Sequence, residues 1–123
     1  MTAKPALVLL YVENVQRSAA FYRDLLGAAP VEESPTFAML PLAGGLMLGL
    51  WGRAGVVPAP GAVGGGEIDF SVADAAAVDA THADWVAAGR KIAQAPTDMD
   101  FGRTFVALDP DGHRLRVLAA PSS

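Results

Sequence analysis

Two acidic side chains have the type and spacing to do chemistry. Glu67 and Asp69 alternate with apolar residues in the segment Glu67-Ile68-Asp69-Phe70-Ser71-Val72, so both carboxylates are expected on one face of a strand. Two neighbouring carboxylates can act as a general acid and a general base, provided that one of them has a raised pKa. They can also serve as polar anchors for a ligand. The sequence is compatible with both roles.

Two basic side chains have a similar spacing near the end of the chain. Two apolar runs flank Asp109-Pro110-Asp111-Gly112, in which proline pre-sets one turn dihedral and glycine tolerates a positive one. This pattern predicts a β-hairpin over 105–118. After the turn, Arg114 and Arg116 alternate with apolar residues and should share one face. That face is either exposed to solvent or lines a polar pocket.

Composition limits the class of protein. The chain has 123 residues, enough for one domain or two small halves, and 52% apolar against 18% charged residues predicts a packed core. The net charge of −4 gives no basic surface for nucleic acid. Apolar runs are too short for a membrane span or a signal peptide, and without cysteine there is no thiolate chemistry. We expect a cytoplasmic protein with neither nucleic-acid nor membrane partners.

The order of elements predicted along the chain is strand, helix and three strands, twice over. In the first half, Asn14 is the expected N-cap and Gly27 the end of a helix, with strands at 6–12, 30–33, 37–42 and 46–51. In the second half, Asp74 and Gly89 are the corresponding residues. Val78, His82, Trp85 and Val86 should form one side of that helix, and the strands are expected at 67–72, 91–95, 103–108 and 113–118.

The two halves indicate an internal duplication. Leu10-Tyr11-Val12-Glu13-Asn14 matches Phe70-Ser71-Val72-Ala73-Asp74 at an offset of 60 residues. We infer a single α+β domain of tandem βαβββ modules, with the first module at 1–52, a linker loop at 53–65 and the second module at 66–123. The linker is rich in glycine, proline and alanine. Neither half is expected to be stable alone, because about 60 residues bury too little surface.

Two motifs in this duplicated frame resemble a known family. The segment 12–27, with its Ser-x-x-Phe-Tyr and Leu-Gly, and the closing Asp109-Pro110-Asp111-Gly112-His113 are similar to motifs of the vicinal oxygen chelate superfamily. That superfamily includes glyoxalase I, bleomycin and fosfomycin resistance proteins and extradiol dioxygenases. The resemblance spans nearly the whole chain. It implies that the paired modules form a cupped mixed sheet around a ligand cavity, in a homodimer.

The resemblance also locates the family's metal ligands, and this chain departs from them. The four positions fall at Leu7, at Glu67, at Arg116 and within 48–50, where every side chain is aliphatic or absent. Only Glu67 could bind a metal, whereas a catalytic site usually needs about three protein ligands. The resemblance therefore implies no metal cofactor. Arg116 is expected to form an ion pair with Glu67 or Asp69 in place of the metal, which favours polar anchoring over acid–base catalysis.

A ligand pocket with apolar walls and polar anchors follows from this alignment. Trp51 could stack on a ligand or pack against the loop, and plain core is expected for at least half of Phe37, Met39, Met47, Met99 and Phe101. Ser71 should face the same pocket. The residues expected to bind the ligand are Leu7, Leu9, Tyr11, Phe37, Met39, Met47, Trp51, Glu67, Asp69, Phe101 and Arg116.

Other polar residues are expected to be structural or solvated. His82 should pack on the second helix and His113 should belong to the turn. Asp98, Asp100 and Arg103 are expected on a solvated loop.

Three functions remain open at this point. The first is metal-independent binding and sequestration of a small, largely apolar, aromatic compound, as in antibiotic-resistance proteins of this type. The second is a lyase or dioxygenase with a divalent metal held by Glu67 and ligands outside the family pattern, such as His113. The third is a metal-free isomerase or lyase that uses Glu67 or Asp69. The pattern does not identify the ligand.

Overall fold

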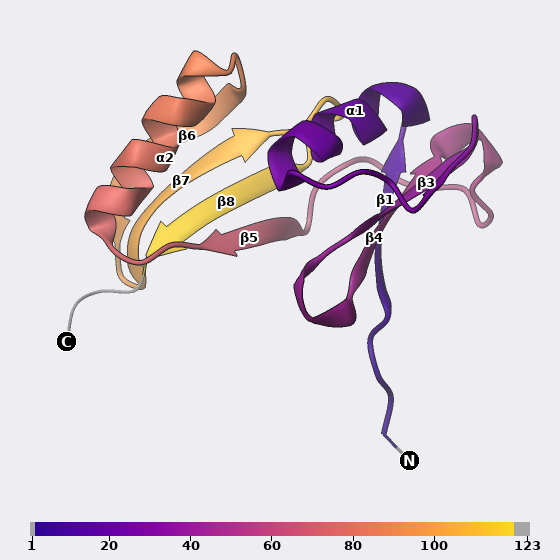
Figure 1. Ribbon diagram of the computed structural model, residues 1–123, viewed down its shortest axis with the longest axis horizontal. Helices are drawn as coiled ribbons and strands as arrows, with labels where there is room; N and C mark the ends of the chain where they lie inside the picture. The colour runs from indigo at the N-terminus through magenta and orange to yellow at the C-terminus, as the bar shows by residue number, and fades with distance from the viewer. Residues whose placement is uncertain (1, 120–123) are drawn as a thin grey trace. The chain divides into compact units, whose positions relative to one another are not determined.

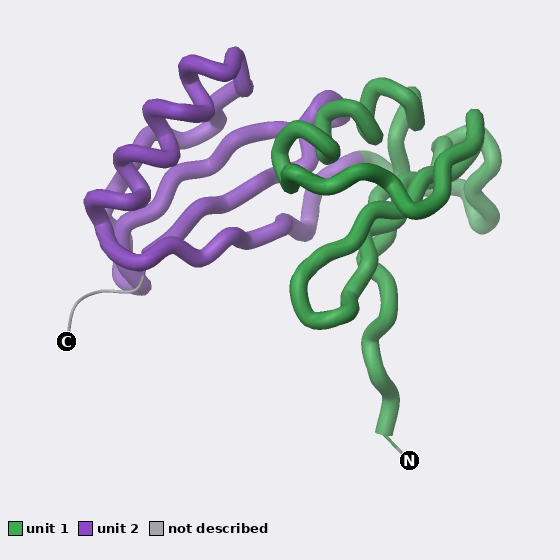
Figure 2. The backbone as a smooth tube through the Cα atoms, in the orientation of Figure 1, with its two compact units in different colours: residues 1–62 green, residues 63–123 purple. Residues whose placement is uncertain are grey.

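The computed structural model describes residues 2–119 and divides the chain into two compact units, residues 1–62 and 63–123 (Figure 2). The boundary falls inside the expected linker. Each unit contains one strand, one helix and three further strands, in the predicted order (Figure 1). Within the described residues, no helix is long and apolar enough to cross a membrane.

Unit 1 is a four-stranded sheet with one helix. Its sheet has the order β1-β4-β3-β2, in which β1 and β4 are parallel and the other pairs antiparallel. The helix contacts β3 and β4. Short 3₁₀ turns precede and follow β4 (η1, Ala43–Gly45, and η2, Arg53–Gly55). The elements are β1 (Leu7–Val12), α1 (Val15–Leu26), β2 (Glu32–Glu33), β3 (Phe37–Pro41) and β4 (Met47–Gly52).

The helix α1 begins and ends where the sequence predicts. The side chain of Asn14 accepts a hydrogen bond from the backbone N–H of Arg17 at 2.9 Å, and so satisfies one of the free donors of the first turn. Gly27 takes the left-handed conformation with φ of 66° and donates its N–H to the carbonyl of Arg23. The buried residues of the unit lie on α1, β1, β3 and β4, together with Val56 after η2, and the fully buried ones include Val12, Ala19, Ala38, Leu40, Leu48 and Leu50.

Unit 2 repeats the arrangement. Its sheet has the order β5-β8-β7-β6, again with the first and last strands parallel. The helix covers one face of β6, β7 and β8 (Figure 1). The elements are β5 (Glu67–Ser71), α2 (Ala75–Ala87), β6 (Lys91–Met99), β7 (Gly102–Leu108) and β8 (Arg114–Ala119).

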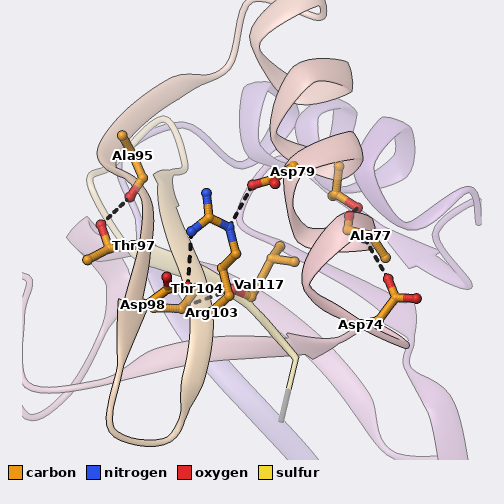
Figure 3. Close-up of polar contacts among 10 residues, drawn as sticks. Asp74, Ala77, Asp79, Ala95, Thr97, Asp98, Arg103, Thr104 and Val117 are labelled. Carbon is orange, nitrogen blue, oxygen red and sulfur yellow. Dashed lines mark hydrogen bonds and ion pairs between the residues drawn. The ribbon is translucent and has the colours of Figure 1, made fainter. Parts of the chain in front are cut away.

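The packing of α2 confirms most of the predicted helix side. Asp74 caps the helix by accepting the N–H of Ala77 at 2.8 Å (Figure 3). His82 and Trp85 both meet the buried ring of Phe105 edge-on, with centroids 5.2 and 5.3 Å away. The prediction for Val86 was wrong, because 51% of this residue is exposed. Val86 follows Trp85 and therefore lies further round the helix, away from the sheet.

The strand β6 is longer than predicted. It continues to Met99, so Asp98 and Arg103 lie in paired strands and not in a loop. Two register shifts, one on each side of Gln94, break the alternation on which a strand prediction depends. Arg103 bridges the strand to the helix, with Nε 2.8 Å from Asp79 and Nη1 3.0 Å from Asp98 (Figure 3).

The predicted hairpin between β7 and β8 is confirmed. The carboxylate of Asp109 accepts the backbone N–H groups of Asp111 and His113 at 2.9 and 2.8 Å, which closes the turn. Gly112 takes a φ of 89°, as a glycine in such a turn can. His113 belongs to this turn, as expected.

Candidate functional site

The predicted ligand-binding residues of unit 1 share one face of its sheet. In the strand register, Leu7 lies opposite Met47, and Tyr11 opposite Trp51, which is in turn opposite Phe37. On the other face, Leu48 and Leu50 of β4 are fully buried, and α1 contacts β3 and β4 there. We call the first surface the apolar face. Its members are Leu7, Leu9, Tyr11, Phe37, Met39, Met47, Gly49 and Trp51.

Gly49 lies at the centre of the apolar face. A Cβ atom at this position would be 2.6 Å from Cδ1 of Leu9, 3.2 Å from Cδ1 of Leu7 and 3.3 Å from Cζ of Phe37. The ends of these three side chains therefore lie directly over the backbone of β4. Sequence reasoning treated 48–50 only as a lost metal position and missed this role of glycine in letting neighbours approach closely.

An aromatic pair borders the apolar face. The rings of Tyr11 and Trp51 meet edge to face, with centroids 6.2 Å apart and planes at 75°. All the side chains on this face keep some exposure, and Leu7 is 42% exposed. The apolar face therefore combines a large apolar area with partial exposure to solvent.

The expectation that at least half of the residues Phe37, Met39, Met47, Met99 and Phe101 are plain core was wrong. Phe37, Met39 and Met47 are only half-buried, and Met99 and Phe101 are exposed. The first three lie on the face opposite α1, where no helix of unit 1 covers them. The other two lie at the turn between β6 and β7.

The predicted polar anchors share one face of the sheet in unit 2. In the register of β5 and β8, Glu67 lies opposite Arg114 and Asp69 opposite Arg116. Ser71 follows on the same side of β5 by alternation. We call this surface the polar face. It also carries Thr104 and Gln94, neither of which was predicted from the sequence. Thr104 alternates with the core residues of β7, and this alternation could have indicated it. Gln94 could not be placed on a face, because β6 shifts register on both sides of it.

Arg116 is the centre of the polar face, and its expected ion pair is confirmed. Its Nε lies 2.6 Å from Oε2 of Glu67, and Nη2 lies 3.3 Å from Oε1 of the same carboxylate. Nη1 donates to Oγ1 of Thr104 at 3.3 Å and to Oε1 of Gln94 at 3.4 Å. The guanidinium also lies 5.8 Å from the ring centroid of Phe101. Four side chains thus hold this arginine in one position.

The two carboxylates of the polar face differ in acidity. The hydrogen bond from Arg116 holds the pKa of Glu67 below its usual value. Burial raises the pKa of Asp69 from 3.8 to about 6, and the hydrogen bond and charge of Glu67 add to the effect. A neighbouring arginine such as Arg116 is expected to oppose a raised pKa in either carboxylate. It does so only weakly at Asp69, because its close contacts are with Glu67.

The residues at the family's metal positions do not fit a metal ion. Leu7 and Gly49 offer no ligand atom, and Arg116 places a cation beside Glu67. Among residues 2–119, no three His, Cys, Asp or Glu side chains come together as a metal site would require. His113, the ligand of the alternative prediction, lies in the turn before β8.

The fold and these motifs belong to a known family. A family model for the Glyoxalase/Bleomycin resistance protein/Dioxygenase superfamily matches residues 4–117. The chain belongs to this superfamily, as the motifs at 12–27 and 109–113 indicated. Among curated proteins it is 34% identical, over 120 residues, to the phenazine antibiotic resistance protein EhpR of Enterobacter agglomerans, a match that covers 94% of this chain and 92% of that protein.

Solved structures confirm the predicted α+β fold. A protein of Agrobacterium tumefaciens, determined by solution NMR, is 48% identical and superposes with a TM-score of 0.89, covering 98% of this chain and 100% of that one. A lactoylglutathione lyase of Agrobacterium tumefaciens superposes with a TM-score of 0.76 at 23% identity, covering 96% of this chain and 94% of the lyase. This second likeness concerns the fold alone.

Proposed function

We propose that this protein binds and sequesters a small, planar, largely apolar aromatic compound without a metal ion. The observation that carries the proposal is the apolar face of unit 1, where aliphatic, aromatic and methionine side chains remain partly exposed on an ordered sheet. Burying such area against a ligand is favourable by about 25 cal/mol per Å². A face of this composition suits an apolar ligand better than a charged metabolite.

The details of the apolar face favour a flat ligand. Gly49 contributes no side chain, so the neighbouring side chains lie close to the backbone of β4. The surface that they present to a ligand is therefore flat at this point. The edge-to-face pair of Tyr11 and Trp51 can contact an aromatic ring at the border of that surface. Met39 and Met47 can adapt to its outline, because methionine side chains are flexible and polarisable.

The relationship to EhpR supports both the class of ligand and the type of role. EhpR is named for resistance to phenazine antibiotics and is 34% identical across nearly the whole chain. Phenazine consists of three fused planar rings, which matches the ligand that the apolar face favours. We therefore propose phenazine-type compounds as ligands and sequestration as the basis of a resistance-type role.

The proposal is tested by titrating the protein with phenazine in a calorimeter, with and without EDTA. Gly49→Ala is the diagnostic variant, because its methyl group displaces Leu9 and raises the surface of the apolar face. Gly52→Ala is the matched control, since its methyl group makes only ordinary contacts, at 3.6 Å, with Thr36 and Val15. We expect Gly49→Ala to weaken binding by about tenfold, or about 1.4 kcal/mol, and Gly52→Ala to change it by less than about twofold.

Two results would contradict the proposal. One is the absence of saturable binding of phenazine by the wild-type protein. The other is binding that EDTA abolishes, because the metal-dependent alternative would then take precedence.

A second candidate function is favoured by the opposite pKa shifts of the two carboxylates, Glu67 and Asp69. Asp69, with a pKa raised to about 6, could exchange a proton with a ligand near neutral pH, as a metal-free isomerase or lyase would require. Chromatography of the bound compound after long incubation distinguishes this from sequestration. The incubated compound must carry an acidic C–H bond or a leaving group, which phenazine lacks, and its recovery unchanged supports binding alone. A new product that Asp69→Asn no longer forms would support catalysis.

A further inference from the structure

A shallow depression of about 290 Å³ lies over β6, β7 and β8 of unit 2, on the polar face. Its lining consists of Ala93, Gln94, Val106, Arg114 and Arg116. We propose that this depression is a binding site for a carboxylate or a similar small anionic oxygen group. The proposal concerns unit 2 by itself and does not rest on the proposed function.

The floor of the depression is shaped by an irregular strand. Val106 is buried, and Gln94 lies opposite it across β6 and β7. The pairing of β6 with β7 shifts register between Ile92 and Gln94 and again between Gln94 and Thr97. Bulges of this kind bend a strand and redirect a side chain. Here they place the amide of Gln94 within reach of Arg116.

The polar groups that line the depression are mostly hydrogen-bond donors. The amide oxygen of Gln94, the one side-chain acceptor, is already engaged by Nη1 of Arg116 at 3.4 Å. The amide nitrogen of Gln94 lies 3.7 Å from Sδ of Met99, which is a weak acceptor that an oxygen ligand could replace. Arginine side chains carry donors only. The chemical complement of this lining is an acceptor with negative charge.

Arg114 supplies a second guanidinium group, whose charge acts on Glu67 across the strand pair but which makes no hydrogen bond to it. Arg116 is committed to Glu67 through two contacts, of 2.6 and 3.3 Å. By contrast, the side chain of Arg114 has no hydrogen-bond or ion-pair partner within residues 2–119. Both carboxylates of the polar face, Glu67 and Asp69, lie on β5, which flanks β8 on the side away from β6 and β7. An anion in the depression would meet two guanidinium groups and no lining carboxylate.

A carboxylate is the group that fits best. Its two oxygens match the paired N–H groups of one guanidinium, and such bonds are about twice as strong as neutral ones. The small apolar area of Ala93 and Val106 lies beside these donors. The two arginines therefore line a polar pocket, which is one of the two alternatives that their alternation in the sequence left open.

The test uses ¹⁵N-labelled protein and follows backbone amide shifts during titration with sodium benzoate, sodium acetate or neutral benzyl alcohol at constant ionic strength. We expect saturable shifts at 93–94, 106 and 114–116 with benzoate and not with benzyl alcohol. Equal binding of acetate would identify a site for any small carboxylate, and preference for benzoate a site for the acid group of an aromatic ligand. Either pattern supports the proposal.

Arg114→Gln is the diagnostic variant, and Arg17→Gln, at an exposed position of α1, is the control with the same change of net charge. Arg114→Gln should weaken benzoate binding by at least about tenfold, and Arg17→Gln by less than about twofold. The proposal is overturned if wild-type shifts do not saturate, if chloride competes as well as acetate, or if Arg114→Gln binds like the wild type. Binding of uncharged phenazine should be the same in Arg114→Gln and the wild type, which separates this site from the apolar face.

Discussion

The ion pair between Glu67 and Arg116 should contribute more to stability than an exposed pair in the same unit. The side chains of Arg116 and Glu67 are only 16% and 28% exposed, and two N–H groups reach the carboxylate. The pair between Arg103 and Asp98 is the natural control, because the side chain of Asp98 is 83% exposed. Both pairs lie in unit 2, so one unfolding transition reports on both.

The expected magnitudes follow from this difference in exposure. Partly buried hydrogen bonds to charged groups contribute about 1.5–3 kcal/mol, whereas exposed ion pairs contribute about 0.2–1 kcal/mol. We expect a coupling free energy of about 2 kcal/mol for Glu67 and Arg116 and about 0.5 kcal/mol for Asp98 and Arg103. Added salt should weaken the second coupling more than the first, because solvent ions screen exposed charges.

Two double-mutant cycles measure these couplings. Each cycle compares the two alanine variants and their combination in urea unfolding, followed by the fluorescence of Trp85 in a Trp51→Phe background. Trp85 packs against Phe105 and therefore reports on unit 2. The experiment is done well above the pKa of Asp69, which is about 6, so that both carboxylates are ionised. A coupling for Glu67 and Arg116 no larger than that of the exposed pair would refute the reasoning.

Three further results are expected. The pKa of Asp69, measured by carboxyl NMR, should be about 6 and should fall in Glu67→Gln while staying above 3.8, because burial persists. The native state then binds this proton more tightly than the unfolded state. The contribution of Asp69 to the free energy of unfolding is therefore complete below pH 3.8 and is lost as the pH rises through about 6. Asp69→Asn should remove this pH dependence from urea unfolding. Gly49→Ala should lower the free energy of unfolding by less than about 1 kcal/mol, because its methyl group meets the ends of side chains on a partly exposed face and Leu9 can move aside, with Gly52→Ala as the control. Asn14→Ala should cost about 1 kcal/mol in the same assay and Asn14→Ser much less, because serine also caps helices.

Much of the fold could be predicted because its signals are local. Asn14 and Asp74 cap the helices through their own side chains, and Gly27 and Gly112 occupy backbone conformations that favour glycine. Strand alternation assigned the faces of β1, β5 and β8 correctly. The prediction failed for β6, where two register shifts interrupt the alternation.

The candidate site was predicted less completely, because its contacts join side chains from different strands. The partner of Arg116 could be inferred from alignment to the family, but Gln94 and Thr104 reach it only through the register of β6, β7 and β8. The raised pKa of Asp69 depends on burial and on which carboxylate the arginine contacts, and no spacing in the sequence determines either. The close approach over Gly49 has the same origin, because Leu9 and Phe37 come from different strands.

The strand order within each unit has a consequence for synthesis on the ribosome. The last strand to be made, β4 or β8, occupies an interior position of its sheet and pairs with both the first strand and the preceding one. The first strand consequently has no backbone partner in its unit until translation reaches the end of that module, since Leu7 pairs with Met47 and Glu67 with Arg114. Such non-local pairing slows folding and leaves apolar strands exposed on the nascent chain. A chain terminated just before β8 would lose the centre of a sheet and not merely its edge.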